Sequence, residues 1–239
     1  MSPIPLKHLI ILSGGAVQKG LETAAENFEK DSGHKLVINF ATAPVLRQKI
    51  ENKEVLPDIV VAPLPTMMEF ESEGCIVAGS SAVIGSVKAG VVVRRGHWTP
   101  DISTAEALKR ELVACESIVY NRGSSGIFAE KLMQRLGIGE LANAKTILHS
   151  DAESVMKHLA NSRTEREIGF GQITAILMHV QIGVRLVGPL PKEVENLTTY
   201  AAGVSTKAEM PEVAEQFISF LVTPASRERF KAAGVDLAR

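Results

Sequence analysis

The sequence lacks several features that would assign a function directly. It has two cysteines, Cys75 and Cys115, and no spacing of cysteine and histidine typical of a metal site. We therefore expect no metal and no other cofactor. Two such cysteines fit a reducing compartment slightly better than an oxidising one. The nucleotide-binding patterns G-x-G-x-x-G and G-K-[ST] are absent as well, which argues against a nucleotide ligand.

An excess of charge of one sign is also missing. The 26 Lys and Arg residues and the 27 Asp and Glu residues give a formal net charge of -1, without a long run of either sign. Nucleic-acid and membrane-surface proteins need a basic face, so we expect neither partner. No stretch approaches the roughly 20 apolar residues that cross a bilayer, and we expect no membrane insertion. Any bound anion must therefore be held by a local site.

A secretory leader is not apparent at the N-terminus. The apolar run at residues 9–12 is shorter than the roughly 7–15 residues of a signal sequence and is typical of a strand. We expect a periplasmic location if a leader has been removed, and a cytoplasmic location for the chain as given.

What the sequence does contain is an alternation of short apolar runs and helical patterns across 239 residues. This alternation predicts an α/β fold with parallel strands. The first strand, 9–12, is followed by a tight turn and a helix that Gly33 ends. Ser103 and Glu106 predict a capping box for a later helix. Further strands are expected at 36–40, 59–62, 90–94, 117–120, 168–170, 184–187 and 198–204, and helices at 152–159, 211–221 and 224–233.

Three strand-to-helix turns place small or hydroxyl residues where a helix begins. Helix N-termini expose unpaired N–H groups and carry partial positive charge, and in an open parallel sheet they lie where ligands bind. A single such turn is better explained by good capping alone, whereas three together favour an anion-binding site. The candidate residues are Ser13, Gly14, Gly15 and Ala16 in the first turn, Thr42 and Ala43 in the second, and Ser124 and Ser125 in the third.

Five other residues near these turns are candidates for ligand binding. Arg47 and Arg122 could each hold a carboxylate through two parallel hydrogen bonds, or be solvated surface residues. Gln172 could offer its amide, and Tyr200 could cap the ligand with its hydroxyl or belong to the core. Pro63 leads from the third strand into the next helix.

Catalytic residues are not identified by any motif. The histidines are scattered, and no G-x-S-x-G sequence occurs, which disfavours covalent acyl transfer. His149 follows the strand-like segment 146–148 and is the histidine to test as an acid or base. The catalytic residue therefore stays unknown.

Several segments together resemble the molybdate-type periplasmic solute-binding proteins. They run in the same order along nearly the whole chain: ILSGGAVQKGLETAAENFEKDSGHKLVINFATAPVLRQKI, PDIVVAP, GVVVRRG, PDISTAEALKREL, SIVY, SSGIFAEKLMQRLGI, VRLVGPLPKEVENLTTYAAGVS and EVAEQFISFLVTPASRERFKAAG. The resemblance implies a two-lobed type II periplasmic-binding-protein fold with a central ligand cleft that closes on its ligand. Lobe 1 would contain residues 1–83 and 200–239, and lobe 2 residues 84–199 with two hinge crossovers.

One departure from this family bears on the ligand. Molybdate binders of this kind carry serine hydroxyls in the first two turns, where this sequence has Ala16 and the segment Thr42-Ala43-Pro44. A tetrahedral oxyanion would lose two donors there, at about 1–3 kcal/mol each. The sequence is more similar to the branch that includes aconitate isomerase, which implies a small organic carboxylate as ligand.

The resemblance leaves three functions open. The first is a solute-binding protein that passes a small anion to the permease of an ABC transporter. The second is an isomerase that acts by proton transfer on a di- or tricarboxylate such as aconitate. The third is a cytoplasmic sensor that uses the same two lobes. Whether the protein is an enzyme is left open, and we expect a monomer.

Overall fold

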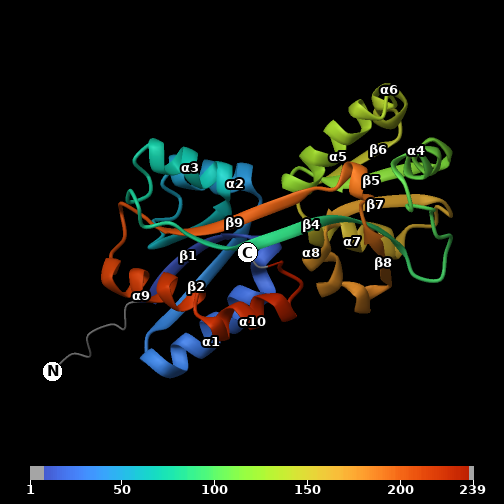
Figure 1. Ribbon diagram of the computed structural model, residues 1–239. Helices are drawn as coiled ribbons and strands as arrows, with labels where there is room; N and C mark the ends of the chain where they lie inside the picture. The colour runs from blue at the N-terminus through green and yellow to red at the C-terminus, as the bar shows by residue number, and fades with distance from the viewer. Residues whose placement is uncertain (1–7, 237–239) are drawn as a thin grey trace. The chain divides into compact units, whose positions relative to one another are not determined.

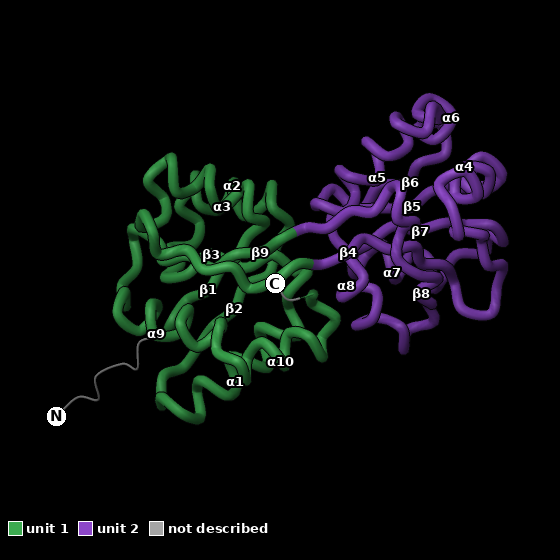
Figure 2. The backbone as a smooth tube through the Cα atoms, in the orientation of Figure 1, with its two compact units in different colours: residues 1–86, 199–239 green, residues 87–198 purple. Residues whose placement is uncertain are grey.

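The computed structural model describes residues 8–236, which pack as two compact units. Of the described residues, unit 1 comprises 8–86 and 199–236, and unit 2 comprises 87–198 (Figures 1 and 2). The strands β4 (Ala82–Arg94) and β9 (Leu197–Val204) contribute residues to both units. The chain therefore passes between the units twice, and the hinge role expected for these crossovers stays a prediction.

The sheet of unit 1 has the strand order β2-β1-β3-β9. Its parallel strands are β1 (His8–Gly14), β2 (Lys35–Ala41) and β3 (Ile59–Pro63), and β9 runs antiparallel to β3. Every residue of β3 is buried, as expected for a central strand covered on both faces. The pairing Gly14↔Ala41 fixes the register of the first two strands, so that their carboxyl ends are level.

Helices cover both faces of this sheet (Figure 1). On one face, Leu46 and Phe70 pack against Leu12 and Val60 of the strands. On the other face, Phe28 meets the ring of Phe217 edge-on with the centroids 5.0 Å apart. The elements are η1 (Gly15–Val17), α1 (Gln18–Ser32), α2 (Ala43–Glu51), α3 (Leu64–Ser72), α9 (Pro211–Leu221) and α10 (Pro224–Ala232).

The sheet of unit 2 is built around β5 (Ser117–Asn121). This strand pairs in parallel with β6 (Thr146–His149) and with β7 (Glu167–Gln172). The strand β4 runs antiparallel to β7 and to β8 (Val184–Pro189). The helices are α4 (Ala105–Ala114), α5 (Ser124–Arg135), α6 (Gly139–Asn143), α7 (Ala152–Asn161), α8 (Ile173–Met178), η2 (Val180–Ile182) and η3 (Lys192–Val194).

Two hydrophobic clusters fill the faces of this second sheet. Leu132 of α5 and Leu112 of α4 pack with Phe170 on one face. Val155 and Leu159 of α7 pack against strand residues on the other face. Within residues 8–236, no helix combines the length and the apolar character needed to cross a bilayer.

The structure corrects two local predictions. The sheets are mixed and not purely parallel, because β4, β8 and β9 each pair antiparallel with a neighbour. The N-cap of α4 is Thr104 and not Ser103, since the Thr104 hydroxyl accepts a hydrogen bond from the N–H of Ala107 at 3.1 Å. The predicted C-cap of α1 is confirmed, because Gly33 has the left-handed φ of 77° that glycine adopts without strain.

Candidate functional site

Unit 1 brings eight of the predicted site residues to one edge of its sheet. Ser13 pairs with Phe40 of β2 and with Val61 of β3, so the carboxyl ends of all three strands lie together. Pro63 ends β3 and pairs with Tyr200 in the middle of β9. The residues gathered along this edge are Ser13, Gly14, Gly15, Ala16, Thr42, Ala43, Pro63 and Tyr200.

The turn after β1 needs glycine at one position and has open space at the next. A Cβ atom added to Gly14 would lie 3.0 Å from Cε1 of Tyr200, so the buried tyrosine ring lies directly against the turn backbone. A Cβ added to Gly15 would meet no described atom within 4 Å outside its chain neighbours. Gly15 thus leaves room for a ligand to approach the main chain where a helical segment begins.

The hydroxyl groups of Ser13 and Thr42 on this edge differ in their hydrogen bonds. The Ser13 side chain is fully buried, and its hydroxyl donates to the carbonyl oxygen of Gly14 at 3.1 Å. Thr42 is the N-cap of α2, but its side chain accepts no capping hydrogen bond from the helix. Gly15 and Ala43 have no side-chain donors, so any hydrogen bond that they donate comes from a main-chain N–H group.

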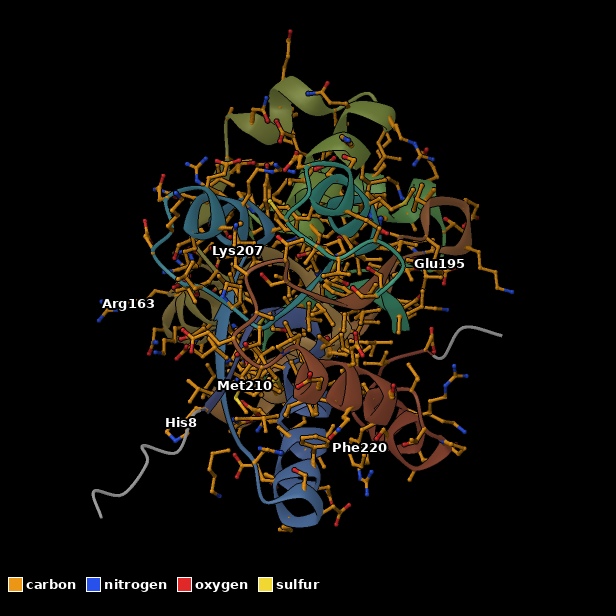
Figure 3. All side chains as sticks on the ribbon, turned by 90° about the vertical axis from the view of Figure 1, so that its left-hand side faces the viewer. His8, Arg163, Glu195, Lys207, Met210 and Phe220 are labelled. Atoms are coloured by element: carbon orange, nitrogen blue, oxygen red, sulfur yellow. The ribbon has the colours of Figure 1, made fainter. Side chains whose placement is uncertain are left out.

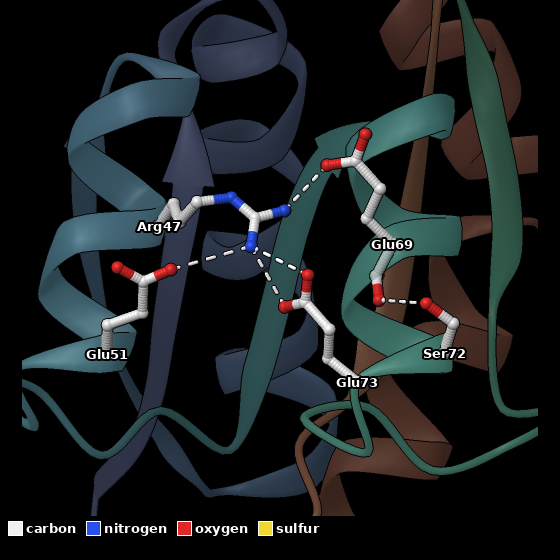
Figure 4. A network of polar contacts seen from close by, with 5 residues as sticks. All are labelled: Arg47, Glu51, Glu69, Ser72 and Glu73. Carbon is white, nitrogen blue, oxygen red and sulfur yellow. Dashed lines mark hydrogen bonds and ion pairs between the residues drawn. The ribbon is translucent and has the colours of Figure 1, made fainter.

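Arg47 of α2 is held by acidic side chains (Figure 4). Its guanidinium lies 2.6 Å from Glu69, 2.9 Å from Glu73 and 3.5 Å from Glu51, and it covers the ring of Phe70. Hydrogen bonding to Glu73, followed by that to Glu69, raises the pKa of Arg47 above its ordinary value. These contacts fasten α2 to α3. A ligand contact by Arg47, which would compete with these ion pairs, stays a prediction.

In unit 2 the third turn packs tightly onto the end of β5. The side chain of Asn121 is buried, and its Oδ1 accepts a hydrogen bond from the N–H of Gly123 at 2.7 Å. A Cβ on Gly126 would lie 1.6 Å from the carbonyl oxygen of Asn121, so only glycine fits there. Ser125 is buried, whereas Arg122 is exposed. The sequence reasoning missed Asn121 because it ends an otherwise apolar strand.

Gln172 lies beside the start of α5. It ends β7, is 5% exposed, and donates through Nε2 to Ser124 Oγ and to Thr198 Oγ1, both at 3.1 Å. Thr198 in turn donates to Asn196 Oδ1 at 3.2 Å. Unit 2 therefore joins the predicted residues Ser124 and Gln172 in one polar network. Thr198 and Asn196 were not predicted, although the hydroxyl-rich segment before Tyr200 offered a signal.

His149 belongs to a polar cluster of the same unit. It pairs with Asn121 at the end of β6, and its carbonyl oxygen accepts from the N–H of Arg122 at 3.2 Å. The rings of His149 and His158 lie 5.0 Å apart, and His158 Nε2 is 3.1 Å from the buried Glu167. Burial, followed by the charge of His158, lowers the pKa of His149. Among residues 8–236, no group of three or more His, Cys, Asp and Glu side chains could hold a metal ion.

Two surface hollows lie away from these turns. One, of about 520 Å³, is lined in part by His8 and Met210 (labelled in Figure 3), at the opposite end of β1 from Ser13. The other, of about 530 Å³, lies beside Trp98 and Arg166 in unit 2. None of the predicted site residues lines either hollow, so the candidate site consists of the strand ends in each unit.

Comparisons with known proteins match this chain along nearly its whole length. A family model described as bacterial extracellular solute-binding protein matches residues 9–236. An aconitate isomerase of Pseudomonas sp is 25% identical over 240 residues, which cover 97% of this chain and 88% of that protein. The solved periplasmic molybdate-binding protein of Azotobacter vinelandii has a TM-score of 0.78 at 17% identity, with 97% of this chain and 100% of that chain covered.

A further solved structure, AgtB of A. tumefaciens R10 in complex with agropinic acid, has a TM-score of 0.73 at 13% identity. The match covers 96% of this chain and 82% of the AgtB chain. These likenesses confirm the predicted two-lobed α/β fold. The positions of the ligand-binding residues and the central cleft stay predictions.

Proposed function

Because this chain belongs to the bacterial extracellular solute-binding proteins, as the molybdate-type resemblance predicted, we propose that it binds a small organic carboxylate and delivers it to an ABC transporter permease. The observation that supports this ligand is the chemistry of the first two turns. Helical segments begin at both turns, and their first main-chain N–H groups are hydrogen-bond donors. Ala16 and Ala43 stand where molybdate binders carry serine hydroxyls, and the Ser13 hydroxyl is used within the fold. A planar carboxylate needs fewer donors than a tetrahedral oxyanion does.

The known relatives support this choice of ligand. The aconitate isomerase acts on a tricarboxylate, and AgtB was solved with an organic acid. Molybdate is the competing ligand, since the Azotobacter vinelandii protein of the same fold binds it. In unit 1 the strand ends are the place proposed for a carboxylate, and in unit 2 the Ser124–Ser125 turn is the corresponding candidate.

The test is a thermal-shift screen followed by calorimetry with purified protein. A ligand that binds only the folded state raises the melting temperature, and we expect cis- or trans-aconitate, citrate or a related acid to do so. Molybdate and sulfate should leave it unchanged. Binding of molybdate with a Kd of about 1 μM or tighter, about -8 kcal/mol, would contradict the organic-acid assignment.

A variant of Gly15 tests where the ligand binds. Replacement by leucine would fill the open space above the turn and weaken binding of the same acid by at least about tenfold, or about 1.4 kcal/mol. Gly15→Ala, with a much smaller side chain, is the matched control. Equal affinities of both variants and the native protein would remove this turn from the site.

A second candidate function is isomerisation by proton transfer, favoured by the match to aconitate isomerase along 97% of the chain. The reaction requires a base beside the acidic C–H bond, and His149, next to the Arg122 turn, is the residue to test. Incubation of aconitate with the protein in deuterated water, followed by NMR, measures the exchange. Tight binding without exchange would exclude the isomerase and leave the transport function.

The compartment and the oligomeric state follow from the transport function. Delivery to a permease requires a periplasmic protein, and fractionation of cells that express the native gene measures its location. We expect a monomer, because one chain is enough to bind one ligand. Size-exclusion chromatography with light scattering would detect a dimer.

A further inference from the structure

The buried side chain of Gln172 has an acceptor that its surroundings leave without a donor. Its two N–H bonds are used, because Nε2 donates to Ser124 and to Thr198. Its Oε1 is buried, and no donor among the described residues reaches it. A buried carbonyl oxygen without a hydrogen bond costs the desolvation free energy of that group, so native proteins rarely retain one without a purpose.

The hydrogen bonds around Thr198 agree with this direction of the amide. A threonine hydroxyl has one proton, and that of Thr198 is donated to Asn196 Oδ1 at 3.2 Å. With the Asn196 oxygen facing Thr198, the Thr198 oxygen accepts from Gln172, and the amide atom that faces it is the NH₂ group. Oε1 is consequently the atom available for a partner outside this network.

The location of this acceptor makes a ligand its natural partner. Gln172 lies at the carboxyl end of β7, which is parallel to β5, and its amide touches Ser124 at the first position of α5. The carboxyl ends of parallel strands are where ligands bind in open α/β sheets. The partner must supply a hydrogen-bond donor, since Oε1 can only accept.

The chemistry of the surroundings favours a neutral donor such as a hydroxyl group. An ammonium group would be placed next to the positive N-terminal end of α5, which disfavours a cation. A carboxylic acid is ionised at neutral pH, because its pKa is about 4, and it then has no proton to donate. A neutral hydroxyl on the same small molecule meets both conditions.

We propose that the ligand is a hydroxycarboxylate whose hydroxyl group donates to Oε1 of Gln172, while a carboxylate is held by the turn at Ser124 and Ser125. The proposal rests on the proposed function, since it specifies the acid that the same site binds. Gln172 is then the residue that distinguishes hydroxy acids from the corresponding acids that lack the hydroxyl.

The experiment compares pairs of acids that differ only in the hydroxyl group. Calorimetry with citrate against propane-1,2,3-tricarboxylate, and with malate against succinate, measures the preference of the native protein. In the pair of acids whose size suits the site, we expect the hydroxy acid to bind at least about tenfold tighter. The acid without the hydroxyl would leave the buried Oε1 of Gln172 without a hydrogen bond.

Gln172→Met removes the acceptor at nearly constant volume and should abolish this preference, largely by weakening the hydroxy acid. Gln181→Met, an exposed glutamine of the same unit, is the control and should retain it. Gln172→Glu, which keeps an acceptor, should retain more of the preference than the methionine variant, and thermal unfolding verifies that each variant is folded.

The outcomes separate this proposal from the function on which it rests. Equal binding of both acids of each pair by the native protein would overturn the hydroxyl assignment and leave carboxylate binding intact. Tighter binding of the acid without the hydroxyl would also overturn it, because Gln172 would then present its NH₂ group. Failure of all these carboxylates, in a protein that binds molybdate or sulfate, would overturn both.

Discussion

The turn after β1 in unit 1 and the turn after β5 in unit 2 share a location at strand ends but differ in what they offer. The first has open space above Gly15 and main-chain donors, with its serine turned inward. The second packs so tightly that Gly126 admits no side chain, and it presents a network of Ser124, Gln172 and Thr198. The difference shows that the same position at a strand end can be open with main-chain donors in one unit and closely packed with polar side chains in the other.

The largest expected effect compares the two glycines. In Gly126→Ala the new Cβ would lie 1.6 Å from the Asn121 carbonyl oxygen, so we expect a loss of about 3 kcal/mol in the free energy of unfolding. Gly15→Ala meets open space and should change it by less than about 0.5 kcal/mol. Urea denaturation measures both. Equal effects would show that the two turns are packed alike.

The hydroxyl groups provide the next comparison. Replacing Ser124 and Ser125 together by alanine should weaken ligand binding at least about tenfold, or about 1.4 kcal/mol, because the turn in unit 2 uses side-chain hydroxyls. Ser13→Ala should leave affinity unchanged, since the Ser13 hydroxyl donates to the main-chain carbonyl oxygen of Gly14. Calorimetry with the acid identified by thermal shift measures both. Unchanged affinity in the double variant would remove that turn from the site.

The two arginines should separate stability from binding. Arg47→Gln breaks the contacts to Glu69 and Glu73 and should cost about 1 kcal/mol in unfolding, with affinity retained. Arg122→Gln, at an exposed position in the third turn, should weaken binding about fivefold, equivalent to about 1 kcal/mol, with stability retained. A loss of affinity in Arg47→Gln would return this residue to the ligand site.

The smallest expected effect is the pH dependence that His149 gives to unit 2. Burial lowers the pKa of His149 in the folded state, so below about pH 6.5 the unfolded state binds more protons. Stability should therefore fall as the pH drops from about 6.5, and His149→Gln should make the curve flatter. Urea denaturation at several pH values measures the slope. A steeper curve in that variant would contradict the sign, and His34→Gln in unit 1 serves as the control.

Most elements of the fold could be predicted because burial leaves a periodic pattern in the sequence. Leu21, Ala24 and Phe28 mark the buried side of α1, and the all-buried β3 reads as a continuous apolar run. Strand direction leaves no such pattern. The antiparallel pairing of β9 with β3 depends on how the chain returns from unit 2, which explains why a purely parallel sheet was predicted.

The candidate site was predictable where main-chain geometry defines it. Small residues after a strand identified the turns at Gly15 and at Ser124. Side-chain partners distant in sequence could not be read in the same way. Glu69 and Glu73 lie 22 and 26 residues after Arg47, so its role in joining α2 to α3 was hidden. The contact between Gln172 and Thr198 spans another 26 residues and was missed for the same reason.

The return of β9 to pair with β3 has a consequence for biosynthesis. A ribosome releases every residue of unit 2 before residues 199–239 emerge, so the contiguous unit 2 can fold while unit 1 is still incomplete. Throughout that interval the apolar β3 has one uncovered edge, and such edges promote aggregation of nascent chains. We therefore expect a truncation late in the gene to damage the part of unit 1 that precedes residue 87 more than it damages unit 2.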